Sequence, residues 1–163
     1  MDIKSAALDF GIITPELVIL AVAMALLLAG NFIRNKGIVA YLALAGLAVA
    51  FIMSLQQWDR LSSGFYGMVQ VDNFAVFFKI IFLTATGVSL LMSRNYLISR
   101  GIERFEFYPL LLFSAMGMMT MAGSSDLVVI FLGLEIMSVP LYVMAGFARH
   151  SAESNESGIK YFM

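Results

Sequence analysis

A carboxyl side chain lies deep inside an apolar stretch, where a charge is costly. Glu135 falls about nine residues into a segment that runs from about 127 to 147, roughly 13 Å along a helix. A carboxylate buried at that depth costs several kcal/mol unless it is paired, hydrated or protonated. A group held in this way is able to exchange a proton. We therefore predict that Glu135 belongs to an ion pathway, and the alternative is a structural carboxyl that bonds a neighbouring helix.

Polar side chains follow Glu135 at helical spacing. Ser138 and Tyr142 come three and seven residues later, and Arg149 follows near the end of the segment. Residues with these offsets share one helix face. Pro140 cannot donate a backbone hydrogen bond, which loosens the helix beside the acid. The pattern predicts a polar track of Glu135, Ser138, Tyr142 and Arg149 that can carry hydrogen bonds and water.

Two lysines lie within apolar segments. Lys79 falls about one and a half turns into a segment over 74–92, and Asp72 lies on the same face seven residues earlier. Either the ammonium group snorkels toward Asp72 and the headgroups, or Lys79 takes part in a relay. Lys160 lies about six residues into a segment that starts near 154. There it is either an interfacial anchor or a proton relay.

Long apolar segments must position these residues. Apolar residues make up 61% of the 163-residue chain and charged residues 13%, against about half and a quarter in soluble domains. Mean hydropathy is +0.90. The segments are apolar on all sides, and each approaches the roughly 20 residues that cross a bilayer. We predict an all-α polytopic transmembrane helical bundle. Its five full spans lie at about 17–32, 38–55, 74–92, 107–122 and 127–147, and a sixth starts at about 154.

The basic residues predict the orientation of these spans. Six of the ten lysines and arginines would lie on one side of the membrane: Arg34, Lys36, Arg94, Arg100, Arg104 and Arg149. Lys4 and Arg60 would lie on the other side. Because basic loops stay inside, the N-terminus is predicted outside. The N-terminal residues lack the features of a cleaved signal peptide, so the first span is expected to be retained.

Composition excludes several function classes. The net charge of −1 gives no indication of nucleic-acid binding. Because the chain has no cysteine and a single histidine, His150, we expect it to hold no iron–sulfur cluster, haem or zinc by itself. We therefore expect no cofactor to be bound by this chain.

Four segments together resemble the antiporter-like membrane subunits of respiratory complex I. They are residues 72–79 (DNFAVFFK), 106–111 (EFYPLL), 126–142 (DLVVIFLGLEIMSVPLY) and 154–162 (SNESGIKYF). The third is similar to the fifth-helix signature of that family and is the most specific. The resemblance extends over the whole chain.

The resemblance implies a fold and an activity. Family members have about fourteen spans in two inverted repeats, and they move protons across the bacterial inner membrane when quinone is reduced elsewhere in the complex. NADH, FMN, iron–sulfur clusters and quinone would be held by partner subunits, and the partners of this chain would be the other membrane subunits and the lipid bilayer. Glu135 matches the family's fifth-helix glutamate, which pairs with a lysine on the seventh helix. Lys160 matches a sixth-helix lysine of some members.

The chain departs from the family pattern because it stops at Met163, within the sixth helix. We expect it to be a piece of a longer subunit that is not active alone. Two other functions stay open. One is a subunit of a multisubunit sodium/proton antiporter or a membrane-bound hydrogenase, and the other is a non-catalytic membrane scaffold in which Glu135 only joins helices.

Overall fold

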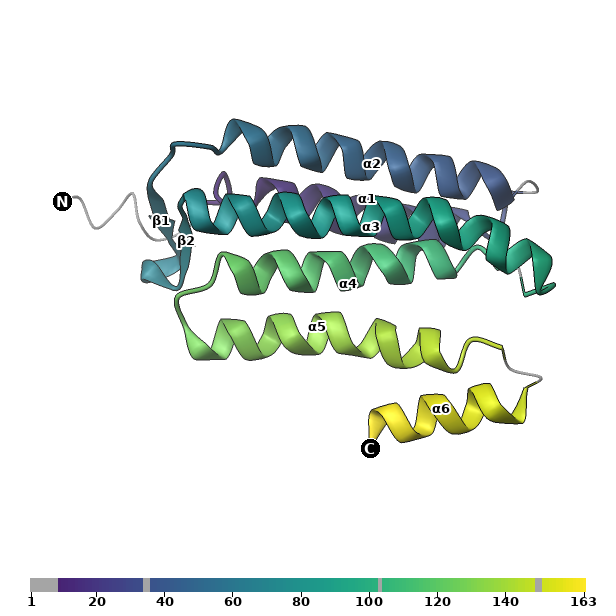
Figure 1. Cartoon of the computed structure of the whole chain (residues 1–163). Coiled ribbons are helices and arrows are strands. Elements are labelled where there is room, and N and C mark those ends of the chain that lie inside the picture. The colour runs from purple at the N-terminus through teal and green to yellow at the C-terminus, as the bar shows by residue number, and fades with distance from the viewer. Residues whose placement is uncertain (1–8, 34–35, 103, 149–150) are drawn as a thin grey trace.

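The computed structural model describes residues 9–33, 36–102, 104–148 and 151–163. The described part is a helical bundle with one short hairpin (Figure 1). The helices are α1 (Thr14–Ala29), α2 (Lys36–Gln56), α3 (Asn73–Ser99), α4 (Phe107–Ala122), α5 (Leu127–Ala145) and α6 (Ala152–Phe162). Between α2 and α3 lie strands β1 (Ser62–Gly64) and β2 (Val69–Val71), joined by the 3-10 turn η1 (Phe65–Gly67).

The connections alternate between two ends of the bundle (Figure 1). One end carries the antiparallel β1–β2 hairpin and the α4–α5 turn, and the two are joined by an isolated bridge between Val69 and Ser124. We call this the hairpin end. The opposite end carries the α1–α2, α3–α4 and α5–α6 connections, which hold most of the arginines, and we call it the basic end.

In the described part of the chain, three helices are long and apolar enough to cross a membrane. They are Gly37–Gln56 in α2, and all of α3 and α5. The apolar helices α1 and α4 have 16 residues each, or roughly 24 Å at 1.5 Å per residue, which is less than a hydrocarbon core of about 30 Å. The helical bundle predicted from the sequence is therefore confirmed, while the crossing of α1 and α4 stays a prediction.

The helices bury one apolar face and leave another uncovered. Ile19, Leu83, Leu112 and Met119 pack in the interior at 0% exposure. Large apolar side chains such as Leu28 and Leu91 remain exposed on the outside of the bundle. An apolar exterior of this extent suits contact with lipid or with other membrane helices.

Helix α4 is central, and α5 approaches it closely. Helix α4 packs against α1, α3 and α5, whereas α5 has α4 on one side and α6 on the other. A Cβ added at Gly117 would lie 2.4 Å from the backbone nitrogen of Met137 and 2.6 Å from the carbonyl oxygen of Gly133. Glycines at this crossing therefore let the α4 and α5 backbones touch.

Two features differ from the sequence prediction. Helix α3 continues to Ser99, beyond the apolar segment that ends near residue 92. Arg94 holds this extension by stacking on Tyr41, whose ring centroid is 5.4 Å away, and by donating to its hydroxyl at 3.2 Å. The hairpin was not predicted, because its strands have only three residues each.

Candidate functional site

A buried ion pair joins α1 to α3 near the hairpin end. The Lys79 Nζ lies 2.7 Å from Glu16 Oε1, and the two side chains are 1% and 6% exposed. Glu16 lies in the first turn of α1, and Lys79 lies roughly 9 Å along α3. The two charges thus neutralise each other inside the bundle.

Gln57, just after α2, links this pair to the backbone before α1. The Lys79 ammonium donates to Gln57 Oε1 at 3.4 Å, and Gln57 Nε2 donates to the carbonyl of Ile12 at 3.1 Å. Gly123, which ends α4, faces the same ammonium, since a Cβ placed there would lie 3.9 Å from Nζ. The first turn of α1, the residue after α2, helix α3 and the end of α4 therefore meet at Lys79.

Of the two alternatives for Lys79, snorkelling toward Asp72 and the headgroups is wrong, and the relay role stays a prediction. Lys79 is buried, and its nitrogen points across to α1. Asp72 instead caps α3, its Oδ1 accepting from the backbone N–H of Ala75 at 2.7 Å. A helical offset shows which residues share a face but not which residue of another helix lies opposite. For this reason the sequence analysis missed Glu16 and Gln57. One signal in the sequence could have pointed to Glu16. A lysine inside an apolar segment needs a carboxylate partner, and Glu16 lies at the start of another apolar segment.

Glu135 lies at the middle of α5 on an uncovered face. It is the ninth of the 19 residues of α5 and is exposed. Among the residues that the structure describes, its carboxyl group has no hydrogen-bond or ion-pair partner. Helix α5 is also the least enclosed of the three long apolar helices, with 17% of its apolar window buried against 39% in α2 and 33% in α3. The acid is therefore open toward whatever packs on α5.

Ser138 and Tyr142 make local contacts in α5. The hydroxyl of Ser138 is buried and donates to the carbonyl of Leu134 at 2.6 Å. The Tyr142 ring packs edge-on against Tyr161 and Phe162 of α6, with centroids 5.1 and 5.6 Å away. Arg149 lies outside the described residues. The polar track from Glu135 through Ser138 and Tyr142 stays a prediction.

Lys160 is exposed on α6. Its Nζ lies 2.6 Å from Glu156 Oε1 one turn earlier, and the two side chains are 70% and 63% exposed. Helix α6 is anchored to α5 by Ser154, whose hydroxyl donates to the carbonyl of Ala145 at 3.0 Å. Gly146 and Gly158 also approach closely there. Helix α6 therefore lies beside the second half of α5. The Lys160 ammonium points away from the described bundle and pairs with Glu156.

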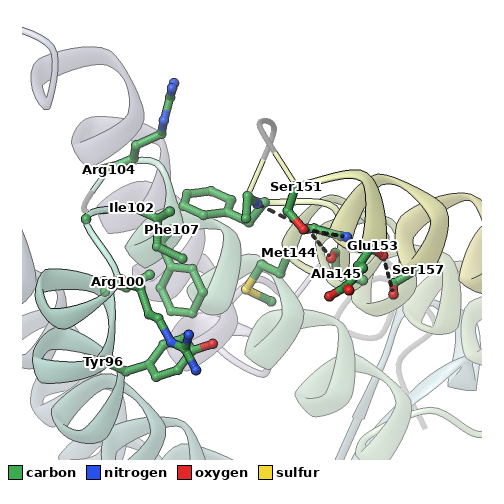
Figure 2. Close-up of a pocket in the computed structure, with 15 residues that line it drawn as sticks. Tyr96, Arg100, Ile102, Arg104, Phe107, Met144, Ala145, Ser151, Glu153 and Ser157 are labelled. Atoms are coloured by element: carbon green, nitrogen blue, oxygen red, sulfur yellow. Dashed lines mark hydrogen bonds between the residues drawn. The ribbon is translucent and has the colours of Figure 1, made fainter.

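A cavity of about 690 Å³ opens at the basic end between the α3–α4 connection, α5 and α6 (Figure 2). Of the described residues in its lining, Arg100, Arg104 and Glu153 are charged, and Phe107 and Met144 are among the apolar ones. The guanidinium of Arg100 stacks on Tyr96. Among the described residues, Glu135, Ser138, Tyr142, Lys79 and Lys160 do not line this cavity.

Comparison with known proteins gives a consistent result. The family model described as NADH:quinone oxidoreductase/Mrp antiporter, TM, matches residues 124–163. NADH-quinone oxidoreductase subunit N of Trichlorobacter lovleyi is 45% identical over 100% of this chain and 35% of its own length. The subunit N of Chloroflexus aggregans is 39% identical over 95% of this chain and 32% of its own length. The chain is a relative of NADH-quinone oxidoreductase subunit N.

The two comparisons cover different sets of ionisable residues. The family model spans α5 and α6, and so includes Glu135, Ser138, Tyr142 and Lys160. Glu16 and Lys79 lie outside that segment but within the longer match to the subunit N of Trichlorobacter lovleyi. The chain spans about a third of the length of the curated relatives that it matches.

Proposed function

We propose that this chain is part of a membrane subunit of NADH-quinone oxidoreductase that moves protons across the bacterial inner membrane while electrons pass from NADH to quinone. The observation that carries the proposal is Glu135, a carboxyl group in the middle of a membrane-length apolar helix, within the segment that the family model matches. The chain would supply the ion step. NADH, FMN, iron–sulfur clusters and quinone would be held by partner subunits of the same complex.

The uncovered face of α5 supports this assignment. Ionisable residues within membrane helices face the bundle interior or a hydrated cavity, and they pair with one another. Because Glu135 is exposed on α5, further helices of the longer protein, or a neighbouring subunit, would cover that face. The resemblance noted above supplies a partner of suitable charge, a lysine on the seventh helix.

The proposed mechanism uses Glu135 as an electrostatic switch. The charged carboxylate stabilises a protonated lysine nearby, because opposite charges attract strongly where water is scarce. When a change in the adjacent subunit separates the two groups, the lysine loses this stabilisation, an N–H bond breaks and the proton passes to the next acceptor. Ser138, Tyr142 and Lys160 would hold the water and protons on either side of the switch.

The proposed topology has five full spans with the N-terminus outside. Helices α1 and α4 would complete their crossings with the apolar residues that flank them, such as Phe32 after α1, which is 87% exposed. The hairpin end would then face the outside and the basic end the cytoplasm, in agreement with the distribution of lysine and arginine. Residues 1–163 would form a single part of the proton-translocating unit.

Replacing Glu135 tests the proposal. We expect Glu135→Gln, in the full-length protein within the assembled complex, to lower the number of protons pumped per electron pair, since an amide cannot hold the charge that stabilises the lysine. Proton uptake by inverted membrane vesicles, measured together with NADH oxidation, gives this ratio. Glu106→Gln is the matched control, because Glu106 precedes α4 and makes no side-chain cap. An unchanged ratio in Glu135→Gln would contradict the proposal.

A second function has support from the description of the family model, which also names Mrp antiporters. The same residues would then serve a sodium/proton antiporter, and a membrane-bound hydrogenase is a related case. Co-purification of the full-length protein with iron–sulfur subunits that oxidise NADH distinguishes the oxidoreductase from both. In a scaffold role, Glu135→Gln would disturb assembly without a selective loss of pumping.

A further inference from the structure

The mechanism built on Glu135 leaves the buried pair of Glu16 and Lys79 without a role. We infer that Glu16 and Lys79 form a second proton-exchanging site, which opens only toward the hairpin end of the bundle. The inference rests on the proposed function, because it assigns to this site an exchange of pumped protons with the water on that side.

Burial makes a purely stabilising role a weak explanation for the pair. Both side chains are almost completely enclosed, so each charge has lost its hydration. A buried ion pair adds little or no stability compared with apolar residues of the same volume, although removal of one partner is costly. Buried ionisable groups in a membrane helix are therefore candidates for function, provided that a proton can bind and leave.

A proton can bind at the free oxygen of the carboxylate. Glu16 Oε1 pairs with Lys79, while Oε2 is buried and has no hydrogen-bond partner within the described ranges. When Oε2 takes up a proton the carboxyl group becomes neutral, so the ion pair gives way to a hydrogen bond from the Lys79 ammonium to Oε1. Uptake breaks an O–H bond of a hydronium ion, forms an O–H bond at Oε2 and changes the net charge of the pair from zero to plus one. Release to water reverses each of these changes.

Polar groups lead from the pair to the surface at the hairpin end. Gln57 accepts from Lys79 and donates to the carbonyl oxygens of Ile12 and Gly11, at 3.1 and 3.4 Å. Gly11 is exposed, and its N–H donates at 2.9 Å to the exposed carboxylate of Asp9. Water along these groups would connect the buried pair to the outer solution.

Among the described residues, no chain of hydrogen bonds leads from Glu16 or Lys79 toward the basic end. Farther along the two helices, the buried residues are apolar except for Thr86 of α3. The apolar ones include Ile19, Ala23 and Leu26 of α1 and Leu83 and Leu90 of α3. Gly123, at the end of α4, also borders the Lys79 ammonium, and it belongs to the α4–α5 turn at the hairpin end. The polar contacts of the pair thus lie on its hairpin side.

The other acidic groups described at this end make hydrogen bonds elsewhere, and Arg60 is exposed. Asp72 and Asp126 each accept a backbone N–H at a helix start, at 2.7 Å in both cases. Asp59 accepts from the side chain of Asn73 at 3.0 Å. Within the described part of the chain, the ion partner of Lys79 is Glu16 alone.

The test uses variants of the full-length protein in its complex, reconstituted in proteoliposomes. Glu16→Leu combined with Lys79→Met removes both charges and keeps the site filled, so we expect normal assembly and NADH oxidation with a loss of protons pumped per electron pair. We expect the loss to depend on the pH of the compartment that the hairpin end faces. Glu16→Gln combined with Lys79→Met is the second variant, in case the apolar pair does not assemble.

A wild-type ratio at every pH, in whichever double variant assembles, would show that the pair is only structural and would overturn the inference. Glu135→Gln, measured in parallel, separates the two proposals. If Glu135→Gln lowers the ratio and the double variants do not, the proposed function stands and the second site is rejected. If the double variants lower the ratio and Glu135→Gln does not, the switch role of Glu135 is rejected instead.

Discussion

At the scale of single residues, the ionisable groups in the apolar helices fall into two environments. Glu16 and Lys79 neutralise each other inside the described bundle, at a distance of 2.7 Å. Glu135 lies on the face of α5 that the described helices leave open. Because a lone carboxylate in hydrocarbon is costly, the second environment requires an additional neighbour and the first does not. The two sites therefore place different demands on the rest of the protein.

Replacing Lys160 should change proton pumping without changing the stability of the protein. The ion pair of Lys160 with Glu156 is exposed, and an i,i+4 pair of this kind contributes about 0.5 kcal/mol or less. We expect Lys160→Met to leave assembly and NADH oxidation near wild type but to lower the proton-to-electron ratio, because the relay loses its titratable group. Proton uptake by vesicles measures the ratio.

Glu156→Gln is the matched control for Lys160. It breaks the same ion pair but keeps the ammonium, so its proton-to-electron ratio should stay near that of the wild type. Equal pumping by Lys160→Met and the wild type would identify Lys160 as an interfacial anchor, the other role that its position allows.

At the scale of elements, the closest contact in the bundle is the crossing of α4 and α5. We expect Gly117→Ala to destabilise the full-length protein by about 1–3 kcal/mol, since the new methyl group would lie 2.4 Å from the backbone of Met137 and would push the helices apart. The yield and thermal stability of the purified complex measure this effect.

Gly87→Ala, in α3, controls for the gain in helix propensity that both substitutions share. A Cβ at Gly87 would lie 3.8 Å from its nearest neighbour, a side-chain atom of Leu47. It should therefore be tolerated or slightly stabilising. If both variants are equally stable, α4 and α5 do not depend on close backbone contact.

The sequence predicted the helices well because their apolar residues form long, uninterrupted runs. It also located the start of α5, where the Asp126 carboxylate accepts from Val128 as expected of a helix cap. What it missed depends on contacts between elements far apart in the chain. Glu16 and Lys79 are 63 residues apart, and no periodicity within one helix relates them. The hairpin was missed for a different reason, because three-residue strands carry too little alternation to be recognised.

At the scale of the whole molecule, both proposals depend on which end of the bundle faces which side of the membrane. The chain contains no cysteine, so a single introduced thiol reports its own location. Ser63, in the hairpin, and Asn31, just after α1, lie at opposite ends and are exposed. We expect Ser63→Cys to react with a membrane-impermeant maleimide in intact spheroplasts. Asn31→Cys should react only after the membrane is permeabilised, because six of the ten basic residues fall in the segments predicted to lie on that side, and basic loops stay in the cytoplasm.

The reverse labelling pattern would place the hairpin end in the cytoplasm. The pair of Glu16 and Lys79, with its path through Gln57 to Asp9, would then exchange protons with the inner rather than the outer solution. It would become a site of proton uptake instead of release. The chemistry proposed for the pair would be the same in either case, since it depends only on burial and on the free carboxylate oxygen. The side of the membrane that the hairpin end faces decides only the direction in which the proton moves.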